Sequence, residues 1–316
     1  MSNLSVGIVG LPNAGKSTLF NALLSRQIAQ VANYPFTTIE PHEGVVPLPD
    51  ERLEKLGEII KPEKLTPATV TFIDIAGLVK DAHKGEGLGN QFLAKIREVD
   101  AICHVVRVFE NSDVSHFYET VDPRRDIEIV NLELELGGIK KPTIYVLNVD
   151  EEQLREKNTP DLLGLGNLEI WTQNYAAAEN CVRPIIICAK LEMELAELSL
   201  HEQKEYLKQL GIEESALERL IKEAYKALGL ITFYTIKGGK EVRAWSLKAG
   251  QTAVEAAGKV HSDFAKNFIK AEVCSFEDLV KIGSWAKARE FGKIRLEGRN
   301  YQIADGEVVE FKVGIY

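Results

Sequence analysis

The sequence predicts an α/β protein whose main domain contains a doubly wound, mostly parallel β-sheet. An apolar run, Leu4 to Val9, leads through a glycine-rich loop into a helical pattern that opens at Ser17. Two further apolar runs, Ala68 to Ile73 and Thr143 to Leu147, each end in a polar loop. Buried strands that alternate with helices and end in polar loops are typical of parallel sheets covered on both faces.

The first of these strands is followed by a phosphate-binding loop. Residues 10 to 17 read Gly-Leu-Pro-Asn-Ala-Gly-Lys-Ser and match the pattern G-x-x-x-x-G-K-[ST]. In such a loop the backbone N–H groups face phosphate oxygens, the lysine reaches the β and γ oxygens, and the hydroxyl can hold Mg²⁺. A chance glycine-rich turn is the alternative, which the strand before and the helix after the loop disfavour. We therefore expect a nucleoside triphosphate to contact Asn13, Ala14, Gly15, Lys16, Ser17 and Thr18.

Two downstream segments have the spacing of nucleotide switches. The second strand ends in Asp74-Ile75-Ala76-Gly77, a D-x-x-G element whose aspartate can hold Mg²⁺ through water while the Gly77 N–H meets the γ-phosphate. Between this element and the phosphate loop lies a Pro-bounded segment, 34–41, which taken alone is only a Pro-rich loop. There Thr38 offers a second hydroxyl to the metal. The expected Mg²⁺ ligands are Ser17, Thr38 and Asp74.

The loop expected to contact the base departs from the guanine-specific pattern. GTPases use Asn-Lys-x-Asp, in which the aspartate accepts hydrogen bonds from N1 and N2 of guanine, whereas residues 148 to 151 here read Asn-Val-Asp-Glu. The longer carboxylate of Glu151 is poorly placed for the guanine edge, so guanine preference should be lost, although Asp150 could substitute. A further run, Pro184 to Cys188, leads into a loop that resembles the one closing over the base. The expected contacts are Asn148, Val149, Glu151, Ala189 and Lys190.

These motifs together resemble the Obg-related branch of P-loop proteins, and within it the YchF family of Obg-like ATPases. The resemblance rests on the phosphate loop, on Thr-Ile-Glu-Pro at 38–41, on Asp-Ile-Ala-Gly-Leu-Val-Lys at 74–80, on Gly-Glu-Gly-Leu-Gly-Asn-Gln-Phe-Leu at 85–93 and on the Asn148 loop. It covers nearly the whole chain. It implies hydrolysis of ATP in preference to GTP on a GTPase-like fold, with the Asn148 loop setting the choice of base.

The group that positions the attacking water must differ from the glutamine of Ras-like enzymes. The corresponding position holds Leu78, whose apolar side chain can neither donate to nor accept from water. The resemblance points to His116, because an imidazole titrates near neutral pH and can orient or deprotonate water. A solvated loop histidine is the alternative, and His83 is a weaker competitor. With Lys16 and Gly77, His116 completes the expected catalytic set.

The resemblance also bears on cofactors. Asn13 matches the asparagine that helps to hold K⁺ in related proteins, so K⁺ is expected beside Mg²⁺. The alternative is an ordinary turn residue, since asparagine is common in turns.

The composition is that of an ordinary globular chain. It has 316 residues, 45% of them hydrophobic, and a formal net charge of −9, which suits two domains with sizeable cores. Cys103, Cys181, Cys188 and Cys274 show no C-x-x-C spacing, so we expect reduced thiols rather than a metal site or disulfides. No apolar run has membrane-spanning length, and the start shows no signal-peptide pattern, so we expect a cytoplasmic protein.

The charge is unevenly distributed along the chain. Residues 230–316 hold 14 Lys and Arg against 11 Asp and Glu, whereas the remainder carries a net charge of −12. In this C-terminal part, short strand patterns surround a helical pattern at 252–264. The arrangement resembles a TGS domain, a β-grasp module that suggests contact with RNA or the ribosome. We therefore expect a nucleotide-binding domain over 1–200, a helical connector over 201–229 and a TGS-like β-grasp domain over 230–316.

Cationic and aromatic side chains alternate near the end of the chain and offer a candidate RNA-binding face. They are Lys281, Trp285, Lys287, Arg289, Lys293, Arg295, Arg299 and Tyr301. A solvated surface with two core aromatic residues is the equal alternative, because the net positive charge of this part is small.

The chain departs from the family between Asp126 and Pro142. The resemblance implies a long helical coiled-coil hairpin inserted there, whereas here a helical pattern passes through Gly137-Gly138 directly to the next strand. The two glycines look like a designed linker, and a natural loss of the hairpin is the alternative. The absence removes none of the nucleotide-contacting residues, but it is expected to weaken docking to a ribosome or RNA.

These observations lead to the hypothesis of a Mg²⁺-dependent ATPase that couples its nucleotide state to ribosome or RNA binding. Two alternatives stay open. An Obg-type GTPase would require residues 148–151 to tolerate guanine. A nucleotide-gated ribosome-binding module would have negligible turnover of its own. No sequence feature indicates a membrane partner.

Overall fold

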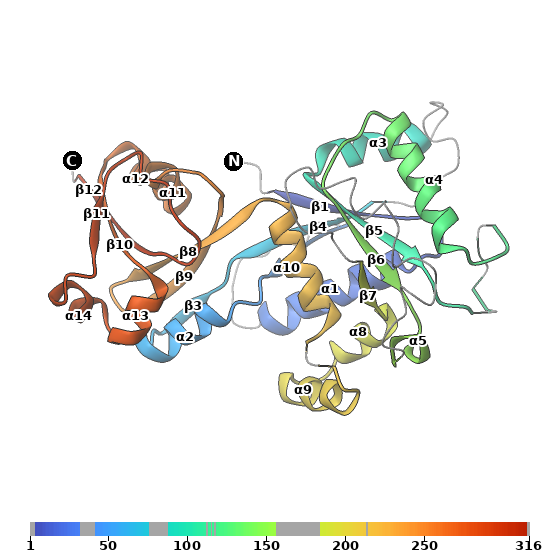
Figure 1. The fold of residues 1–316 in the computed structure, drawn as a ribbon, viewed down its shortest axis with the longest axis horizontal. Coiled ribbons are helices and arrows are strands. Elements are labelled where there is room, and N and C mark those ends of the chain that lie inside the picture. Colours follow the sequence, from blue (N-terminus) through green and yellow to red (C-terminus); the bar gives the residue numbers. More distant parts are fainter. Residues whose placement is uncertain are drawn as a thin grey trace. The chain divides into compact units, whose positions relative to one another are not determined.

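The computed structural model describes residues 4–31, 42–75, 88–111, 113, 114, 116, 118–155, 184–212 and 214–314. The chain forms two compact units, one of residues 1–46 and 70–228 and the other of residues 47–69 and 229–316. Each unit contains one six-stranded sheet among the described residues (Figure 1).

The sheet of the first unit has the strand order β2-β4-β1-β5-β6-β7. Its strands are β1 (Ser5–Val9), β2 (Glu43–Pro47), β4 (Thr69–Asp74), β5 (Ala101–Arg107), β6 (Thr143–Asn148) and β7 (Ile185–Ile187). The pairs β1–β4, β1–β5, β5–β6 and β6–β7 are parallel. Every residue of β1, β5 and β6 is buried, as expected for strands covered on both faces.

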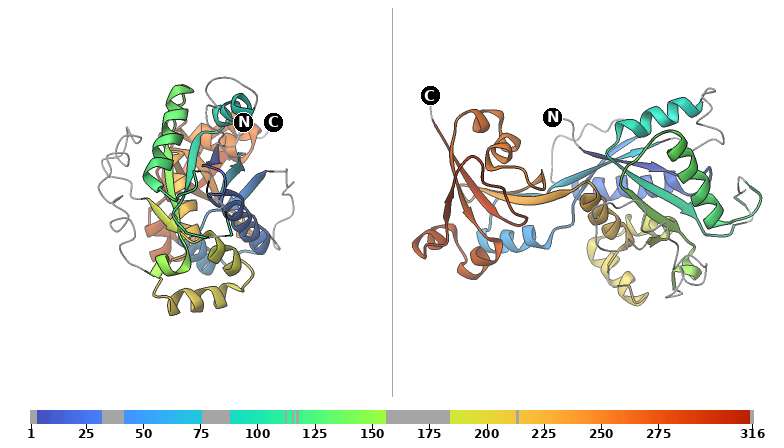
Figure 2. Two further views of the ribbon diagram at one scale, coloured as in Figure 1. Left: turned by 90° about the vertical axis from the view of Figure 1, so that its right-hand side faces the viewer. Right: turned by 45° about the horizontal axis from the view of Figure 1, so that its top comes forward.

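Helices lie on both faces of this sheet, as Figures 1 and 2 show. They are α1 (Lys16–Val31), α3 (Leu88–Glu98), α4 (Pro123–Leu136), α5 (Glu151–Arg155), α8 (Ala189–Leu195), α9 (Leu200–Gln209) and α10 (Ala216–Ala227). On one face, Ile96 of α3 and Val130 of α4 pack with Val9 and Ile102 of the strands. Helices α1, α8 and α10 lie on the other face. The prediction of a doubly wound, mostly parallel α/β fold is confirmed.

Helix α10 is part of the first unit, whereas the sequence analysis expected residues 201–229 to form a connector. Leu217, Leu220 and Ile221 form a buried stripe at helical spacing, and the helix contacts β5, β6 and β7. At its N-terminus, the Ser215 hydroxyl donates a hydrogen bond of 2.7 Å to the buried carboxylate of Glu192 in α8. An amphipathic helix gains stability by burying its apolar stripe, and the sheet of the first unit offers the matching surface.

The second unit contains a mixed sheet with the order β11-β10-β12-β8-β9-β3. Its strands are β3 (Lys64–Thr66), β8 (Leu230–Lys237), β9 (Glu241–Lys248), β10 (Phe268–Cys274), β11 (Arg295–Glu297) and β12 (Val308–Val313). Its helices are α2 (Glu51–Ile60), α11 (Ala253–Val260), α12 (Ser262–Lys266), α13 (Phe276–Ile282) and α14 (Trp285–Glu290). Ala256 and Ala257 of α11 pack against Phe233 and Leu247 of the sheet. The single helix expected over 252–264 is divided at His261, whose backbone is extended.

Residues 47–69 belong to the second unit, although the sequence analysis placed them in the nucleotide-binding domain. Strand β3 extends the sheet beside β9 in parallel, and α2 contacts β9. The side chain of Asp50 joins the two segments, since one of its oxygens caps α2 and the other accepts a 2.6 Å hydrogen bond from the buried Tyr234 hydroxyl. Arg52 pairs with Asp305 at 2.7 Å, and Asp305 also accepts from the Thr232 N–H. These long-range contacts leave no local signal in the sequence.

Gly137 and Gly138, which the sequence analysis interpreted as a designed linker, end α4 in a Schellman motif. The Gly138 N–H donates to Glu135 O and the Ile139 N–H donates to Leu134 O, both at 2.9 Å. Gly138 has a φ of 67°, the left-handed conformation that this motif requires. The side chains of Leu134 and Ile139 lie in one buried cluster, so the junction is a packed helix terminus.

Substitution of Gly138 tests this helix terminus. We expect Gly138→Ala to lower the free energy of unfolding by about 1–2 kcal/mol, because a Cβ disfavours left-handed backbone, and Gly138→Asn to lower it less. Gly298→Ala is the control, since an added Cβ there meets nothing and the backbone is not left-handed. Denaturant unfolding followed by circular dichroism measures the effect, and equal stability of Gly138→Ala and the parent would contradict it.

Candidate functional site

The phosphate loop connects the end of β1 to the start of α1, where the backbone N–H groups of the first helical turn have no partner within the helix. Gly15 has a φ of 94°, and a Cβ at this position would lie 2.1 Å from Asn148 Nδ2. The loop therefore requires glycine for its conformation and for its close approach to β6. The side chains of Asn13 and Ser17 are exposed, whereas Ala14 is buried.

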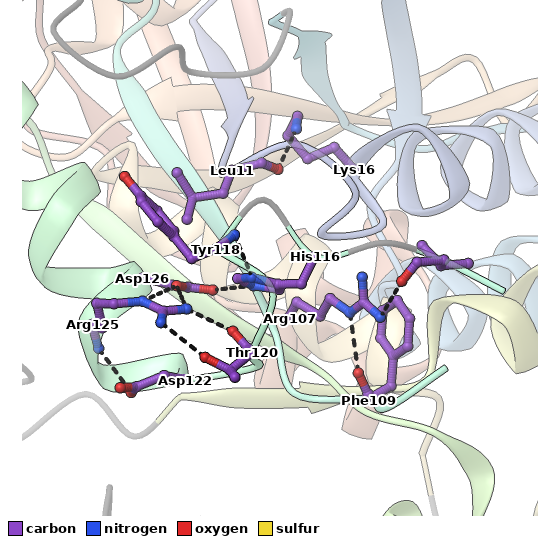
Figure 3. A network of polar contacts seen from close by, with 11 residues as sticks. Leu11, Lys16, Arg107, Phe109, His116, Tyr118, Thr120, Asp122, Arg125 and Asp126 are labelled. Carbon is purple, nitrogen blue, oxygen red and sulfur yellow. Dashed lines mark hydrogen bonds and ion pairs between the residues drawn. The ribbon is translucent and has the colours of Figure 1, made fainter. Parts of the chain in front are cut away.

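Lys16 folds back over the loop. Its Nζ donates a 2.8 Å hydrogen bond to Leu11 O, and the residue is 8% exposed (Figure 3). Burial lowers the pKa of Lys16 to about 8, while the charge of Asp74 acts in the opposite direction. A desolvated ammonium is stabilised by an anion, so the electrostatics of the loop favour a phosphate ligand.

Asn148 joins the phosphate loop to the loop after β7. Its Nδ2 donates to Ala14 O and its Oδ1 accepts from the Ala189 N–H, each at 3.0 Å, and the side chain is buried. Its own carbonyl oxygen accepts from the N–H groups of Val108 and Phe109. The structure thus brings together three of the loops that the sequence analysis assigned to the nucleotide. Sequence reasoning had given Asn148 a nucleotide contact but had missed this bridging role.

The other residues of the expected base loop differ in their placement. Val149 is 2% exposed and packs in a core cluster with Leu191, so its side chain does not face a base. The Asp150 carboxylate accepts from the Gln153 N–H at 2.8 Å, and the Asp150 N–H donates to the side-chain oxygen of Gln153. Asp150 is therefore the N-terminal cap of α5. Glu151 begins α5 and is half-buried, and the exposed Lys190 lies 3.9 Å from Glu194.

The expected Mg²⁺ ligands are described only in part. Ser17 lies exposed in the first turn of α1, and Asp74 ends β4 close enough to Lys16 to act on its charge. A hydroxyl and a carboxylate are hard oxygen ligands of the kind Mg²⁺ prefers, so these residues fit the ion. In the described part of the chain, no three His, Cys, Asp or Glu side chains form a metal cluster. Several residues that the sequence analysis expected near the phosphates and the metal lie outside the described residues: Thr38, Gly77, Leu78 and His83.

His116 is buried in a polar network, as Figure 3 shows. Its side chain is 3% exposed, its Nε2 lies 2.8 Å from Asp126 Oδ2, and its Nδ1 accepts from the Tyr118 N–H. Because Nδ1 is an acceptor, Nε2 carries the hydrogen that Asp126 accepts. Arg125 binds the other oxygen of Asp126, contacts Thr120 and stacks over the Tyr118 ring. Both ring nitrogens are engaged, so this structure does not present His116 to a water molecule.

Arg107 fixes the segment that leads to His116, a role the sequence analysis missed. Its guanidinium donates to the carbonyls of Phe109 and Val114 at 3.1 and 2.9 Å and stacks 4.4 Å from the centre of the Phe109 ring. Burial lowers the pKa of Arg107, and the charge of Asp126 partly offsets this effect. The sequence signal that could have indicated a positioning role is an arginine that directly ends an apolar run, since arginine is rarely buried without a partner.

His104 is a second buried polar residue that the sequence analysis missed. It is 1% exposed in β5 and lies against Tyr145, with 5.4 Å between ring centroids. Burial, together with the charge of Lys16, lowers the pKa of His104 to about 3, so the ring is neutral. Its Nδ1 has no hydrogen-bond partner within the described part of the protein.

The candidate RNA-binding face near the end of the chain consists largely of ion pairs. Arg289 pairs with Glu272, Lys293 lies 3.4 Å from Asp278, and Arg295 pairs with Glu307. The two aromatic residues also bind carboxylates, Trp285 through its Nε1 to Glu310 and Tyr301 through its hydroxyl to Glu307. Arg299 donates to a backbone carbonyl. Among the described residues, Lys281 and Lys287 are the lysines of this set without an ion pair, and both are exposed. The pairing of the other cations favours the alternative of a solvated surface.

Three of the four cysteines lie in the described part of the chain. Cys103, Cys188 and Cys274 are buried and free, and burial raises the pKa of each thiol. Cys181 lies outside the described residues. No helix in the described part of the chain is long and apolar enough to cross a membrane.

The site and the fold are those of a P-loop nucleotide-binding protein of the GTPase structural class. This class is defined here by the phosphate loop, the bridging asparagine and the order of the strands. The family model MMR_HSR1, described as 50S ribosome-binding GTPase, matches residues 5–149. The model YchF-GTPase_C, described as a protein of unknown function (DUF933), matches residues 230–314. The chain belongs to the YchF family, because relatives more than 40% identical match it over its whole length.

Two of these relatives carry the name ribosome-binding ATPase YchF. The one from Bacillus subtilis is 42% identical over 99% of this chain and 100% of its own, and the one from Haemophilus influenzae is 43% identical over 98% and 99%. The Bacillus alignment spans 374 positions, more than the 316 residues of this chain, so that relative has residues with no counterpart here. Among solved structures, the Schizosaccharomyces pombe YchF GTPase is 30% identical with a TM-score of 0.82 and covers 99% of this chain and 98% of its own.

Removal of the Asn148 amide tests its bridging role. We expect Asn148→Ala to weaken nucleotide binding at least tenfold, because Ala14 O and the Ala189 N–H lose their partner and two nucleotide loops separate. The accompanying loss of stability is about 1–3 kcal/mol. Asn131→Ala is the control, since that amide also makes two hydrogen bonds, to the Tyr145 hydroxyl, away from the loop. Titration with a fluorescent nucleotide measures the affinity of each variant. Equal affinities of the two variants would contradict the bridging role.

Proposed function

We propose that this protein is a Mg²⁺-dependent ATPase that links its nucleotide state to ribosome binding. The observation that carries the proposal is the Asn148 bridge, which holds the phosphate loop and the loop of Ala189 around one site while Glu151 stands where guanine-specific proteins have aspartate. The names of the bacterial relatives support ATP as the nucleotide and the ribosome as the partner.

Each residue of the site has a proposed role in this reaction. Lys16 stabilises charge on the β and γ phosphates, and Gly77 reports the γ-phosphate through its N–H. The loop around Gly15, with Ala14 and Thr18, binds phosphate through backbone and hydroxyl donors. Ser17, Thr38 and Asp74 would hold Mg²⁺, which when bound neutralises developing charge on the phosphate oxygens. Asn13, exposed at the turn of the loop, is the proposed K⁺ contact.

The choice of base depends on the loop that follows β6. The Asp150 carboxylate accepts the Gln153 N–H at the start of α5, which leaves Glu151 as the candidate carboxylate of this loop for the base. An Obg-type GTPase is the second candidate, and it is favoured by the Schizosaccharomyces pombe relative, which is named a YchF GTPase. Lys190 and Ala189 would flank the base in either case.

Side-by-side measurements with ATP and GTP test the proposal. We expect ATP to bind and turn over in preference to GTP, and Glu151→Asp to move the preference towards GTP, because aspartate suits the N1 and N2 donors of guanine. Glu151→Gln is the control, since it removes the carboxylate and keeps the length of the side chain. Tighter binding of GTP than ATP by the parent would establish the second candidate instead.

His116 is the proposed group that positions the attacking water, and this role requires the imidazole to leave its pocket. The ring would give up two hydrogen bonds, to Asp126 and to the Tyr118 N–H. Asp126 would keep its pairing with Arg125, so no buried charge would be left unpaired. The released Nδ1 or Nε2 could then orient a water molecule.

Replacement of His116 tests the catalytic role. We expect His116→Ala to lower the turnover of ATP by about 10²–10⁴-fold while the affinity changes by only a few fold, because water positioning acts in the transition state. His261→Ala is the control, since that histidine is exposed in the second unit. Equal single-turnover rates for the His116 variant and the parent would assign the role to another group.

The proposed partner is the ribosome, which places the protein in the cytoplasm. The alternative for a ribosome-binding protein is a nucleotide-gated module with negligible turnover of its own. Measuring ATP turnover with and without ribosomes separates this module from an ATPase. The Schellman motif at Gly138 supports a nucleotide-binding fold that stays intact without the hairpin. Docking would then depend on a smaller surface than in longer relatives.

Comparison with a relative that has the hairpin tests this difference. We expect this protein to sediment with ribosomes more weakly than the longer relative, and its binding to fall as salt rises, because the remaining contacts are electrostatic. ATP binding should be similar in the two proteins. Co-sedimentation at about 50 and 200 mM salt measures the effect, and equal, salt-insensitive binding would show that the hairpin is not required.

A further inference from the structure

One end of the sheet in the second unit gathers cations from two distant parts of the chain. Lys237 ends β8, Lys240 lies in the turn between β8 and β9, Arg243 belongs to β9, and Lys64 belongs to the edge strand β3. The Lys64 N–H donates to Lys240 O at 3.1 Å, which joins β3 to this turn. All four side chains belong to exposed residues.

Strand register places most of these side chains on one face. In the β8–β9 pairing, Lys237 lies opposite Glu241 and Thr235 opposite Arg243. In the β3–β9 pairing, Lys64 lies beside Glu241. Thr66, the next residue on the same face of β3, lies beside Arg243. Because side chains alternate along a strand, these residues share the face that also carries Trp245. The Trp245 Nε1 donates to the Thr235 hydroxyl at 2.9 Å, in agreement with this assignment.

The guanidinium of Arg243 lies over an aromatic ring. Its central carbon is 3.9 Å from the centre of the Trp245 ring, and Trp245 in turn stacks on Phe233 of the neighbouring strand with 6.4 Å between ring centroids. A guanidinium fixed in this way loses less freedom on binding and presents its outer plane to a partner. Bases of unpaired RNA stack on such planes, and their phosphates bind lysine.

The balance of charge distinguishes this end of the sheet from the α13–α14 region. Around α13 and α14, the arginines and Lys293 are paired with carboxylates. At the β8–β9 turn, negative charge comes from the exposed Glu63 and the half-buried Glu241. Glu241 accepts from the Thr66 hydroxyl at 2.9 Å, and its charge also acts on Arg243. The cations therefore outnumber the carboxylates here.

We propose that Lys64, Lys237, Lys240 and Arg243 on Trp245 form the surface through which this protein contacts unpaired RNA. The proposal rests on the proposed ribosome partner and specifies the part of the chain that meets its RNA. The lysines contact phosphates and the Arg243 plane stacks on a base. The surface combines residues 64–66 with residues 235–245, so it exists only because 47–69 folds into the second unit.

Anisotropy of a fluorescent oligouridylate, titrated with the full-length protein, tests this surface. We expect Lys237→Gln with Lys240→Gln to weaken binding about tenfold at low salt and to reduce the slope of log K against log salt by about 1 for each lysine. Lys281→Gln with Lys287→Gln makes the same change in net charge on α13 and α14, and it should change the affinity less than twofold. ATP turnover without RNA should be the same in all of these proteins.

Arg243→Lys separates stacking from charge. We expect this variant to bind the oligouridylate several-fold more weakly with an unchanged salt slope, because an ammonium retains the charge without the plane. Equal losses in both lysine pairs, or none in either, would overturn the assignment, as would failure of the parent to bind RNA. Displacement of the RNA by polyglutamate of matched charge would assign the surface to an acidic protein. None of these results depends on ATP turnover. A failure of the RNA-binding proposal can therefore be distinguished from a failure of the proposed ATPase activity.

Discussion

The nucleotide site depends above all on one buried amide, that of Asn148. Its two polar atoms join Ala14 of the phosphate loop to Ala189 after β7. Three chain segments that are far apart in the sequence therefore share one hydrogen-bonded centre. Because both partners are backbone groups in a buried setting, any residue without an acceptor and a donor in this geometry leaves one of them unsatisfied. The close approach of Asn148 also explains why the loop needs glycine at position 15.

Around this centre, the molecule buries several charged groups and pairs them. Lys16, Arg107 and Asp126 are each held by backbone carbonyls or, for Asp126, by the half-buried Arg125. Such groups are costly to bury unless they are compensated, which fixes the geometry of the segment before α4. His116 is part of this arrangement in the described structure, and its proposed catalytic role therefore involves an exchange of hydrogen bonds rather than a preformed contact.

The two units are interleaved along the chain. Residues 47–69 leave the first unit after β2 and return at β4, and in between they supply an edge strand and a helix to the second unit. The buried hydroxyl of Tyr234 and the carboxylate of Asp50 join this excursion to the C-terminal sequence. A single domain boundary near residue 229 therefore does not describe the folded units, because residues 47–69 fold with the sequence that follows this boundary.

The sequence by itself determined the class of the protein. Its glycine-rich loop, the order of its buried strands and the departure at Glu151 depend on local patterns, and such patterns are written in consecutive residues. For the same reason it indicated Lys16 and Asn148 as site residues. Only the tertiary structure decided that Asn148 is a bridge, that Val149 is core, that His116 is paired with Asp126 and that residues 47–69 join the second unit. Each of these depends on contacts between residues far apart in the chain, and burial and pairing of this kind leave no periodic signal in a sequence.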